Sequence, residues 1–198
     1  MLKVKLRVSN NITNKKTTDI ILSKWKENTV ELEKMLQIYE EAFPIDERRD
    51  LSKEREMITN KKIDLYILKF KDSQKVLGFI AIWNFNDVLF IEHFAIKKEE
   101  RTKGYGSLMF KSIQDNSYKK VIVLELEPPE SSSAAQLRIK FYKRLGVNLN
   151  KFDYIQPPYS DTKKPVKMII ASYPRILTNE EFNRIKTVVY QNVYGIKL

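Results

Sequence analysis

The chain has 198 residues, a formal net charge of +11 at pH 7, one histidine and no cysteine. At 42% hydrophobic residues it can bury one sizeable core, and the lack of cysteine excludes a disulfide framework and a Cys-ligated metal site. A single histidine, His93, excludes a histidine-rich metal site and disfavours a Ser/His triad. We therefore expect one domain that binds no metal.

The positive charge could bind nucleic acid, an anionic membrane or an anionic cofactor. Lys and Arg are spread through every segment of the chain, which is typical of a solvated surface. The opening MLKVKLRVSNN lacks the apolar core of a secretory signal, and no apolar run reaches bilayer-spanning length. These features indicate a cytoplasmic protein that does not enter a membrane.

Hydrophobic periodicity predicts the elements of the first half of the chain. Strict alternation indicates a strand, and apolar residues three or four apart indicate a helix. The pattern predicts a strand at 2–8, helices at 30–42 and about 48–60, and strands at 63–70, 75–83 and 88–96. Short turn signals separate the last three strands, so we expect an antiparallel meander.

The second half begins with a change of period after residue 96. The expected elements are a helix from Tyr105 to about 115, a strand at 120–126, a helix from a Ser131–Ser133 cap to Gly146, a strand at 166–173 and a helix at 178–194. In the helix before Gly146, we expect Ala134, Leu137, Phe141 and Leu145 to face inward. With no repeat and no linker, the whole chain is interpreted as one mixed α/β domain.

A glycine-bearing loop, RTKGYG at 101–106, lies between strand 88–96 and the following helix. Such a loop points several backbone N–H groups in one direction at the positive end of the helix dipole. Gly104 and Gly106 permit close approach, and Arg101 and Lys103 add charge. The loop therefore predicts a phosphate or pyrophosphate site, although a plain strand-to-helix turn also explains the glycines. There is no GxxxxGK[ST] sequence and no three-glycine dinucleotide fingerprint.

Glu92 is the one carboxylate in the apolar strand VLFIEHFAI. Desolvation would favour its neutral form, which suits a general base that deprotonates an ammonium group. The alternative is a structural ion pair with a lysine or arginine. Alternation puts Phe90, Glu92 and Phe94 on one face of the strand and His93 on the other, so His93 is expected to be a packed residue.

RTKGYG resembles the R/Q-x-x-G-x-G/A loop of the GNAT superfamily, the acetyl-CoA-dependent N-acetyltransferases, and it too stands between a strand and a helix. KVIVLELE followed by a helix ending in FYKRLGV resembles that family's second motif, FYxxxGF. The resemblance covers about 20–173 and implies one GNAT-like domain over 1–198, with the helix at 178–194 following the core. It implies a central, mixed but mostly antiparallel sheet of about six to seven strands flanked by helices. The fourth and fifth strands would splay apart around the pantetheine arm of acetyl-CoA.

The resemblance also implies roles for particular residues. The backbone of Phe94, Ala95 and Ile96 would pair with the pantetheine amides, and strand N–H groups near Phe94 would stabilise an oxyanion. Tyr142 would protonate the departing thiolate unless it is only a core aromatic, and an acidic residue at the position of Glu92 would be the base. The pyrophosphate would be held by the N–H groups of Arg101, Thr102, Lys103, Gly104, Tyr105, Gly106 and Ser107. Ser131–Ser133 replace an asparagine that often contacts the cofactor in the family.

The family's acceptor cleft would be formed here by YEEAFPIDERRD (39–50) and YIQPPYSDTKKP (154–165), segments that resemble those of bacterial members. Phe43, Glu125 and Tyr159 are the substrate-binding candidates, although acids on helices are usually solvated and aromatics usually belong to a core. The acceptor could be a small-molecule or protein amine, and the protein a monomer or homodimer. Two alternatives to an acetyltransferase stay open: a catalytically inactive acetyl-CoA sensor, and a basic nucleic-acid-binding module, which the lack of RNA-reading motifs disfavours.

Overall fold

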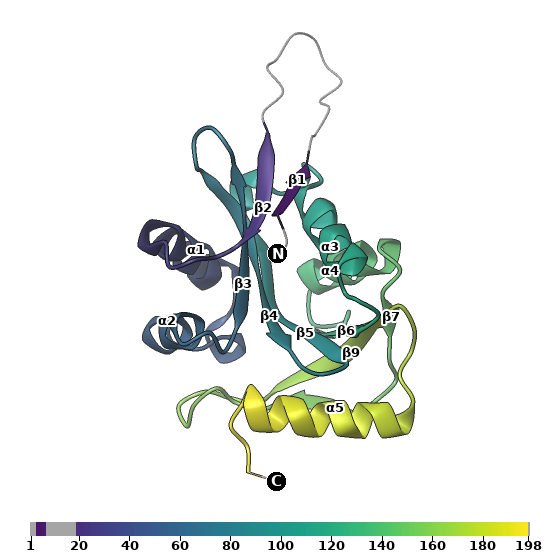
Figure 1. The fold of residues 1–198 in the computed structure, drawn as a ribbon. Coiled ribbons are helices and arrows are strands. Elements are labelled where there is room, and N and C mark those ends of the chain that lie inside the picture. Colours follow the sequence, from purple (N-terminus) through teal and green to yellow (C-terminus); the bar gives the residue numbers. More distant parts are fainter. Residues whose placement is uncertain (1–2, 7–18, 198) are drawn as a thin grey trace. The chain divides into compact units, whose positions relative to one another are not determined.

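A computed structural model describes residues 3–6 and 19–197 (Figure 1). Of the strand expected at 2–8, only 3–6 lie within the described residues. The chain divides into two compact units: Met1–Phe43, Leu51–Ile82 and His93–Asn116 form the first, and Pro44–Asp50, Trp83–Glu92 and Ser117–Leu198 form the second. The single-domain interpretation stays a prediction, and each unit is described by itself.

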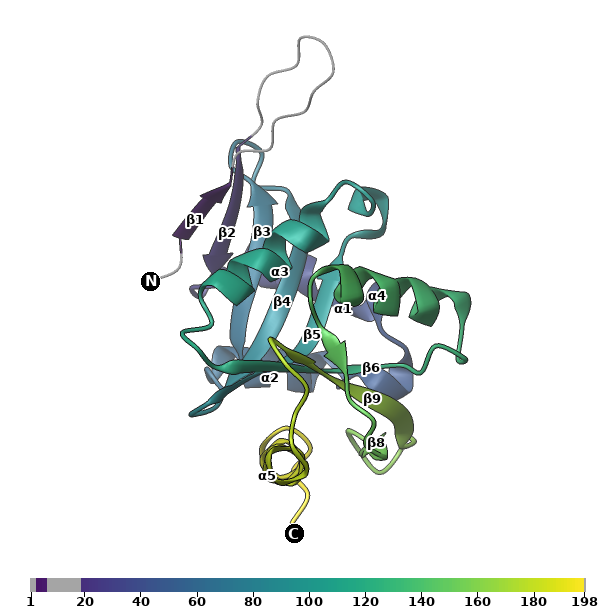
Figure 2. The ribbon, with the colours of Figure 1, turned by 90° about the vertical axis from the view of Figure 1, so that its right-hand side faces the viewer.

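The first unit places helices on both faces of a group of antiparallel strands. Its elements are β1 (Lys3–Leu6), β2 (Ile20–Lys24), α1 (Thr29–Ala42), α2 (Leu51–Thr59), β3 (Asp64–Phe70), most of β4 (Val76–Asn84), the end of β5 (Val88–Ile96), the 3-10 turn η2 (Lys98–Glu100) and α3 (Tyr105–Asp115). In Figures 1 and 2, α1 and α2 lie on one face of β2–β4 and α3 on the other. Because both faces are covered, β4 is buried from Val76 to Trp83 and carries almost no polar side chain.

The second unit is assembled around β6 and β9. Its elements are the 3-10 turn η1 (Ile45–Glu47), the start of β5, β6 (Val121–Leu126), α4 (Ser133–Arg144), β7 (Asn148–Leu149), β8 (Tyr154–Gln156), β9 (Val166–Tyr173) and α5 (Asn179–Asn192). β9 pairs antiparallel with β6, β7 and β8. In Figures 1 and 2, α4 and α5 lie on opposite sides of β6 and β9.

The hydrogen-bonded strand order is β1-β2-β3-β4-β5-β6-β9-β7, with β8 paired to β9. The expected mixed, mostly antiparallel sheet is confirmed, but the described residues form nine strands where six to seven were expected. The additional strands are β2, to whose residues no element was assigned from the sequence, and β7 and β8, which have two and three residues. So short a strand has too few residues to show a period of two.

The expected fourth and fifth strands, 88–96 and 120–126, are β5 and β6. They are parallel, and their register runs from Val88↔Val121 to Ile91↔Leu124. Pairing therefore covers only the first four residues of β5, as expected for two strands that separate beyond that point.

The inward face of α4 differs in part from the prediction, since Leu145 is buried as expected but Ala134 is exposed. Leu137, expected inside, is 67% exposed, whereas Ala135, Ile139 and Tyr142 are buried. Both sets have helical spacing, so periodicity alone could not choose between them. The buried set includes the large ring of Tyr142. At the start of the helix, the side chain of Ser132 caps α4 by accepting a hydrogen bond from Ala135 N at 3.0 Å.

Candidate active site

The loop that leads into α3 contains two residues with left-handed backbone conformation. Thr102 has φ 63° and Gly104 has φ 83°. Gly104 is the N-cap residue of α3, so no side chain caps the helix start, and a Cβ built at Gly104 would meet no atom within 4 Å. An uncapped helix N-terminus beside open space suits an anion.

Four charged side chains lie at or beside this loop and are held by hydrogen bonds or ion pairs. Glu100 is buried and pairs with Lys75 Nζ at 2.6 Å and Lys103 Nζ at 2.8 Å. Burial opposes ionisation of Glu100, but hydrogen bonds from Lys103 and Lys75 outweigh it and lower the pKa of its carboxyl. Arg101 Nε donates to the Ile96 carbonyl at 3.0 Å, which ties the loop to the end of β5.

The end of β5 packs closely on β4 within the first unit. A Cβ added to Gly78 would lie 2.6 Å from the carbonyl oxygen of Ala95, so β4 needs glycine at this position. Lys97 N donates to the Leu77 carbonyl at 2.8 Å. Phe94 stacks on Phe110 of α3, with 6.5 Å between ring centroids. These contacts set the position of the strand end that was predicted to bind pantetheine.

His93 is 1% exposed and fills an aromatic cluster. Its ring meets Tyr39 and Phe43 edge to face, at centroid distances of 4.8 and 4.7 Å. The expected packing of His93 is therefore observed. Phe43, a predicted substrate residue, is half-buried against His93 and Phe79.

In the second unit, three donors converge on the side chain of Glu92. Arg49 Nη1 lies 2.6 Å from Oε1, and the two side chains are 5% and 0% exposed. Trp83 Nε1 donates to Oε2 at 2.7 Å, and Tyr159 OH donates to Oε1 at 3.0 Å. Because hydrogen bonds and a cation all favour the charged form, Glu92 is the anion of a buried ion pair.

Arg49 is held on several sides. Its Nη2 donates to the Val193 carbonyl at 2.8 Å, and its guanidinium carbon lies 4.8 Å from the ring centroid of Tyr159 and 5.9 Å from that of Trp83. Stacking on aromatic rings suits the planar guanidinium, which is less strongly hydrated than an ammonium. Arg49 thus compensates Glu92 without exposure to water.

Glu125 on β6 has a different set of partners. Its carboxylate accepts hydrogen bonds from Tyr154 OH, and from Tyr194 OH at 2.6 Å. Burial raises the pKa of Glu125 to about 7 against these two hydrogen bonds, with smaller contributions from the charges of Glu92 and Glu47. Glu125 therefore exchanges a proton near neutral pH.

Glu47 is a second carboxyl that titrates in this range. Burial, and secondarily the charge of Glu127, raises the pKa of Glu47 to about 7. Glu127 itself is paired with Arg138 of α4.

Tyr142 is 5% exposed and lies edge to face against Phe141, with centroids 5.0 Å apart. Burial raises the pKa of its phenol above the ordinary value. At neutral pH the phenol therefore retains its proton, as a proton donor must.

Comparisons with known proteins agree on one family. The model of the acetyltransferase (GNAT) family matches residues 32–147, more than half of the chain. A structure from Bacteroides thetaiotaomicron, described as a GNAT-family acetyltransferase, is 30% identical and covers 89% of this chain and 99% of its own, with a TM-score of 0.78. The chain belongs to the GNAT acetyltransferase family.

More distant structures share the GNAT fold. The ribosomal-protein-S18-alanine N-acetyltransferase of Escherichia coli is 18% identical, with a TM-score of 0.56 over 81% of this chain and 97% of its own. A GNAT acetyltransferase from Elizabethkingia anophelis, solved with acetyl-CoA bound, is 17% identical, with a TM-score of 0.52 over 77% of this chain and 96% of its own. No curated protein sequence matches the chain.

The second unit of this GNAT chain brings several predicted site residues together. Tyr159 contacts Glu92, and its ring lies 5.0 Å from that of Tyr194, which in turn contacts Glu125. Sequence reasoning missed Arg49, Trp83 and Tyr194. The contact of Trp83 with Glu92 could have been predicted, because the turn at Asn84–Asp87 makes their two strands neighbours in a hairpin. Arg49 lies in the segment 39–50 that was expected to form the acceptor cleft, but nothing in the sequence pairs it with Glu92. Tyr194 had no signal, since it is far from Glu125 in sequence.

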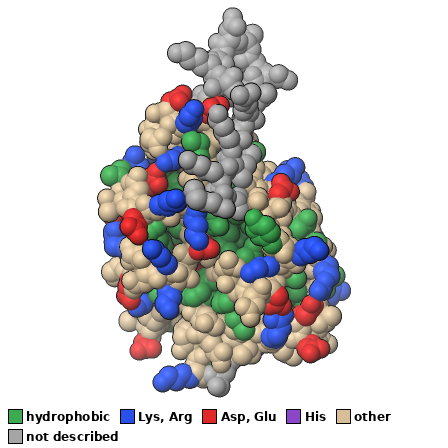
Figure 3. All heavy atoms as spheres, viewed as in Figure 1, with side chains coloured by type: hydrophobic (Ala, Val, Ile, Leu, Met, Phe, Trp, Pro, Cys, Tyr) green, Lys and Arg blue, Asp and Glu red, His purple; other side chains and the backbone are tan. Residues whose placement is uncertain are grey.

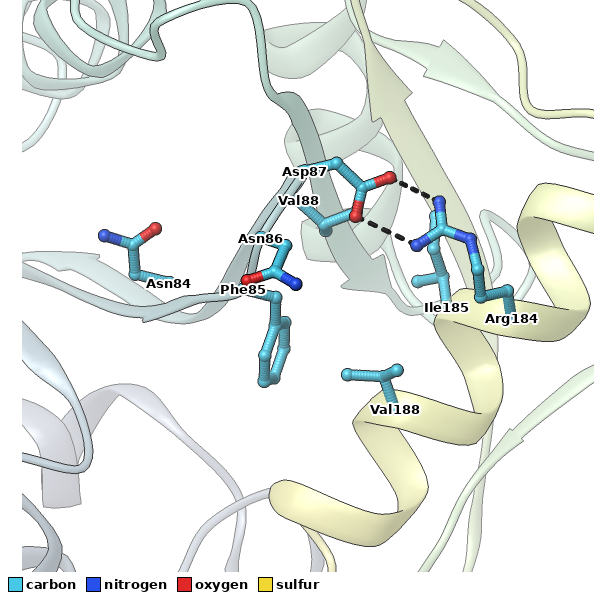
Figure 4. Close-up of a pocket in the computed structure, with 8 residues that line it drawn as sticks. All are labelled: Asn84, Phe85, Asn86, Asp87, Val88, Arg184, Ile185 and Val188. Carbon is cyan, nitrogen blue, oxygen red and sulfur yellow. Dashed lines mark hydrogen bonds and ion pairs between the residues drawn. The ribbon is translucent and has the colours of Figure 1, made fainter.

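A cavity of about 280 Å³ opens at that same turn (Figure 4). It is lined by the turn residues and α5, and Arg184 and Asp87 form a bidentate ion pair at its edge, at 2.9 and 2.5 Å. None of the predicted site residues lines this cavity.

Residues 3–6 and 19–197 include no cluster of three metal-ligating side chains and no helix long and apolar enough to span a membrane.

Proposed function

We propose that this GNAT-family protein transfers the acetyl group of acetyl-CoA to a primary amine. The observation that carries the proposal is the loop before α3, where left-handed Gly104 leaves the helix start without a side-chain cap and a Cβ at Gly104 would meet no atom within 4 Å. The pyrophosphate of acetyl-CoA would accept hydrogen bonds from the N–H groups of Arg101–Ser107. The family match over 32–147 supports the same ligand.

The reaction would be direct attack by a free amine on the thioester carbonyl. Acetyl-CoA supplies the activated acyl group, and the backbone of Phe94–Ile96 would bind the pantetheine and stabilise the oxyanion. Tyr142 keeps its proton because burial raises its pKa, and it would give that proton to the thiolate. Between the two roles considered for Glu92, its contacts with Arg49, Trp83 and Tyr159 favour the ion pair.

The distant structures of the same fold leave the acceptor open. The Escherichia coli structure is named for an alanine N-acetyltransferase, and other structures with the same fold are named for aminoglycoside 6'-N-acetylation and phosphinothricin N-acetylation. All three activities acylate an amine, on acceptors of very different size. At 12 to 18% identity they support the fold alone, so the acceptor of this chain has to be found by assay.

Calorimetric titration with acetyl-CoA tests the ligand. We expect micromolar binding by the native protein and at least a tenfold loss in a Gly104→Asp, Gly106→Asp double variant, because added carboxylates repel the pyrophosphate. Gly195→Asp is the matched control, since Gly195 also has positive φ and open space around its Cα but lies outside the loop. Equal binding by the double variant, or no binding by a folded native protein, would contradict the proposed site.

Turnover separates an enzyme from a sensor. We would assay thiol release from acetyl-CoA with a diamine, an aminoglycoside, an amino-acid amide and a peptide N-terminus as acceptors. Tyr142→Phe should lower kcat by about 10²-fold or more without weakening acetyl-CoA binding, and Phe141→Leu is its control for packing. Tight acetyl-CoA binding without transfer to any of these amines would favour the inactive-sensor alternative.

A further inference from the structure

The cavity at the turn between β4 and β5 has no part in the proposed reaction (Figure 4). Its volume is about 280 Å³, and all the residues that line it belong to the second unit. One wall is the turn from Asn84 to Val88, and the other is α5, through Arg184, Ile185 and Val188. The family match ends at residue 147, so the cavity is completed by a helix that lies outside the matched region.

Both walls of this cavity are held by contacts of their own. Val121 N donates to the Asp87 carbonyl at 3.0 Å, and Lys120 Nζ donates to the Phe85 carbonyl at 2.6 Å. These two bonds tie the turn to the start of β6. The helix wall begins with a capping box at the N-terminus of α5. A ligand therefore meets a largely preformed cavity, as is usual for small-molecule sites.

The interior of the cavity is apolar. Phe85 and Val88 belong to the turn, and Ile185 and Val188 belong to α5. Figure 4 shows the Phe85 ring and the Val188 side chain extending from the two walls toward the space between them. A cavity of about 150 Å³ is large enough for benzene. The 280 Å³ here can therefore accommodate one apolar side chain together with a small polar group.

The edge of the cavity carries one charge of each sign. Arg184 of α5 and Asp87 of the turn form the bidentate ion pair, and their side chains are 48% and 56% exposed. The hydrogen bond from Arg184 lowers the pKa of Asp87, so Asp87 is an anion at neutral pH. Asp87 repels a simple anion and Arg184 repels a simple cation. Only a ligand that carries both charges is attracted to both side chains.

We propose that this cavity binds a free α-amino acid with an aliphatic or aromatic side chain. The ligand's carboxylate would take the bidentate position on Arg184 that Asp87 now occupies, and its ammonium would bind the Asp87 carboxylate. Its side chain would lie between Phe85 and Val188. Exposed ion pairs contribute little to stability, so exchanging the internal partner for the ligand's charges is inexpensive. This inference goes beyond the proposed acetyl transfer and does not depend on it.

The charges at the edge also select against peptides and proteins. A free amino acid carries its ammonium and its carboxylate on one carbon, which suits two side chains that lie within hydrogen-bonding distance of each other. A residue inside a polypeptide carries neither of these charges, and a chain terminus carries only one. The ion pair therefore favours the free amino acid.

Both walls lead to the buried ion pair of the candidate active site. The Phe85 ring stacks on Trp83, with 6.1 Å between centroids and 18° between planes, and Trp83 donates to Glu92. On the other side, α5 continues to Val193, whose carbonyl accepts from Arg49. A ligand that contacts Phe85 is therefore expected to change the environment of Trp83, and fluorescence of this tryptophan would report it.

Calorimetry without acetyl-CoA tests the ligand. We expect L-leucine or L-phenylalanine to bind the native protein with a Kd below about 1 mM. Three probes should each bind about tenfold more weakly or worse: glycine, which has no side chain, 4-methylpentanoate, which has no ammonium, and N-acetyl-L-leucine amide, which has no charge. In a Trp25→Phe variant, Trp83 is the only tryptophan, and its fluorescence should change with the same Kd.

Two pairs of variants locate the site. Arg184→Met should weaken binding of the amino acid at least tenfold. Its matched control is Arg175→Met, which removes another exposed bidentate pair, with Glu181, outside the cavity and should keep the native affinity. Val188→Phe fills the cavity and should abolish binding. Thr187→Phe adds the same ring at the exposed neighbouring position and should leave the affinity within twofold.

The outcomes are decisive even if Val188→Phe does not fold, because Arg184→Met changes an exposed side chain and circular dichroism would confirm its native fold. Unchanged affinity in folded Arg184→Met would overturn the inference. Equal binding of L-leucine and its neutral amide would also overturn it, since the charged edge would then have no role. So would the absence of heat with both amino acids at about 10 mM. None of these results depends on whether the protein acetylates an amine.

Discussion

At the scale of single residues, the buried ion pair of Glu92 and Arg49 carries a large desolvation cost. Both side chains are removed from water, and desolvating two charges costs several kcal/mol per ion before their attraction offsets it. The pair is tolerated because every polar atom that faces inward has a partner: Glu92 accepts from Trp83 and Tyr159, and Arg49 donates to the Val193 carbonyl. Removing one partner should therefore cost much more than the pair contributes.

We expect Arg49→Met to lower the free energy of unfolding by about 3 to 5 kcal/mol, because it leaves the Glu92 charge buried without its cation. Urea denaturation followed by circular dichroism would measure the change. Lys53→Met is the control, since Lys53 belongs to an exposed pair with Glu56 and should cost less than about 1 kcal/mol. A loss below about 1 kcal/mol in Arg49→Met would show that Glu92 is not held as an ion.

At the scale of elements, the contact of β4 with the end of β5 restricts the strand that was predicted to bind pantetheine. Glycine weakens a strand interior and marks places where another backbone comes close. Gly78 fits this description, since a Cβ there would lie 2.6 Å from both the Ala95 oxygen and Ile96 Cδ1. The terminal carbon of Ile96 can move aside, but the carbonyl of Ala95 cannot move without the strand.

Gly78→Ala should therefore lower the free energy of unfolding by about 1 to 3 kcal/mol through overpacking. It should also weaken acetyl-CoA binding, if Phe94–Ile96 pair with the pantetheine as proposed. Thermal denaturation and calorimetry would measure the two effects. Adding Ile96→Val relieves only the side-chain contact, so we expect partial rescue, and full rescue by the double variant would disprove the backbone explanation.

At the scale of the whole molecule, the chain carries a net charge of +11. Figure 3 shows Lys and Arg side chains interspersed with Asp and Glu on the face drawn, in agreement with the solvated surface that the sequence predicted. The pKa values of Glu125 and Glu47 are each raised from 4.5 to about 7. A raised pKa in the folded state means that protonation favours folding, so this stability is present below pH 4.5 and is lost as pH rises through 7.

Comparison of Glu125→Gln with the native protein should reveal this pH dependence. Gln cannot ionise, so the free energy of unfolding of the variant relative to the native protein should increase between pH 4.5 and pH 8. The expected increase is on the order of 2 kcal/mol, measured by urea denaturation at each pH. Asp153→Asn, at an exposed site of the same unit, should show no such trend. A difference that is constant across this range would mean that Glu125 titrates normally.

The sequence alone determined those features of the protein that local residue patterns encode. β5 and β9 begin and end at the predicted residues, because alternation and turn signals are encoded over a few neighbouring positions. The glycine loop was predicted from its residues, and the family followed from two motifs that the comparisons then confirmed. The side of α4 that faces inward was not determined, since Leu137 and Tyr142 lie on alternative stripes with the same spacing.

Only the tertiary structure decided what surrounds the two carboxylates. Sequence placed Glu92 in an apolar strand and left open whether it is a base or half of an ion pair. Its cation comes from 43 positions earlier, and the phenols on Glu125 come from residues 29 and 69 positions later. The charge state of a carboxyl depends on burial and on neighbours within a few ångströms, and chain folding, rather than sequence separation, brings those neighbours together.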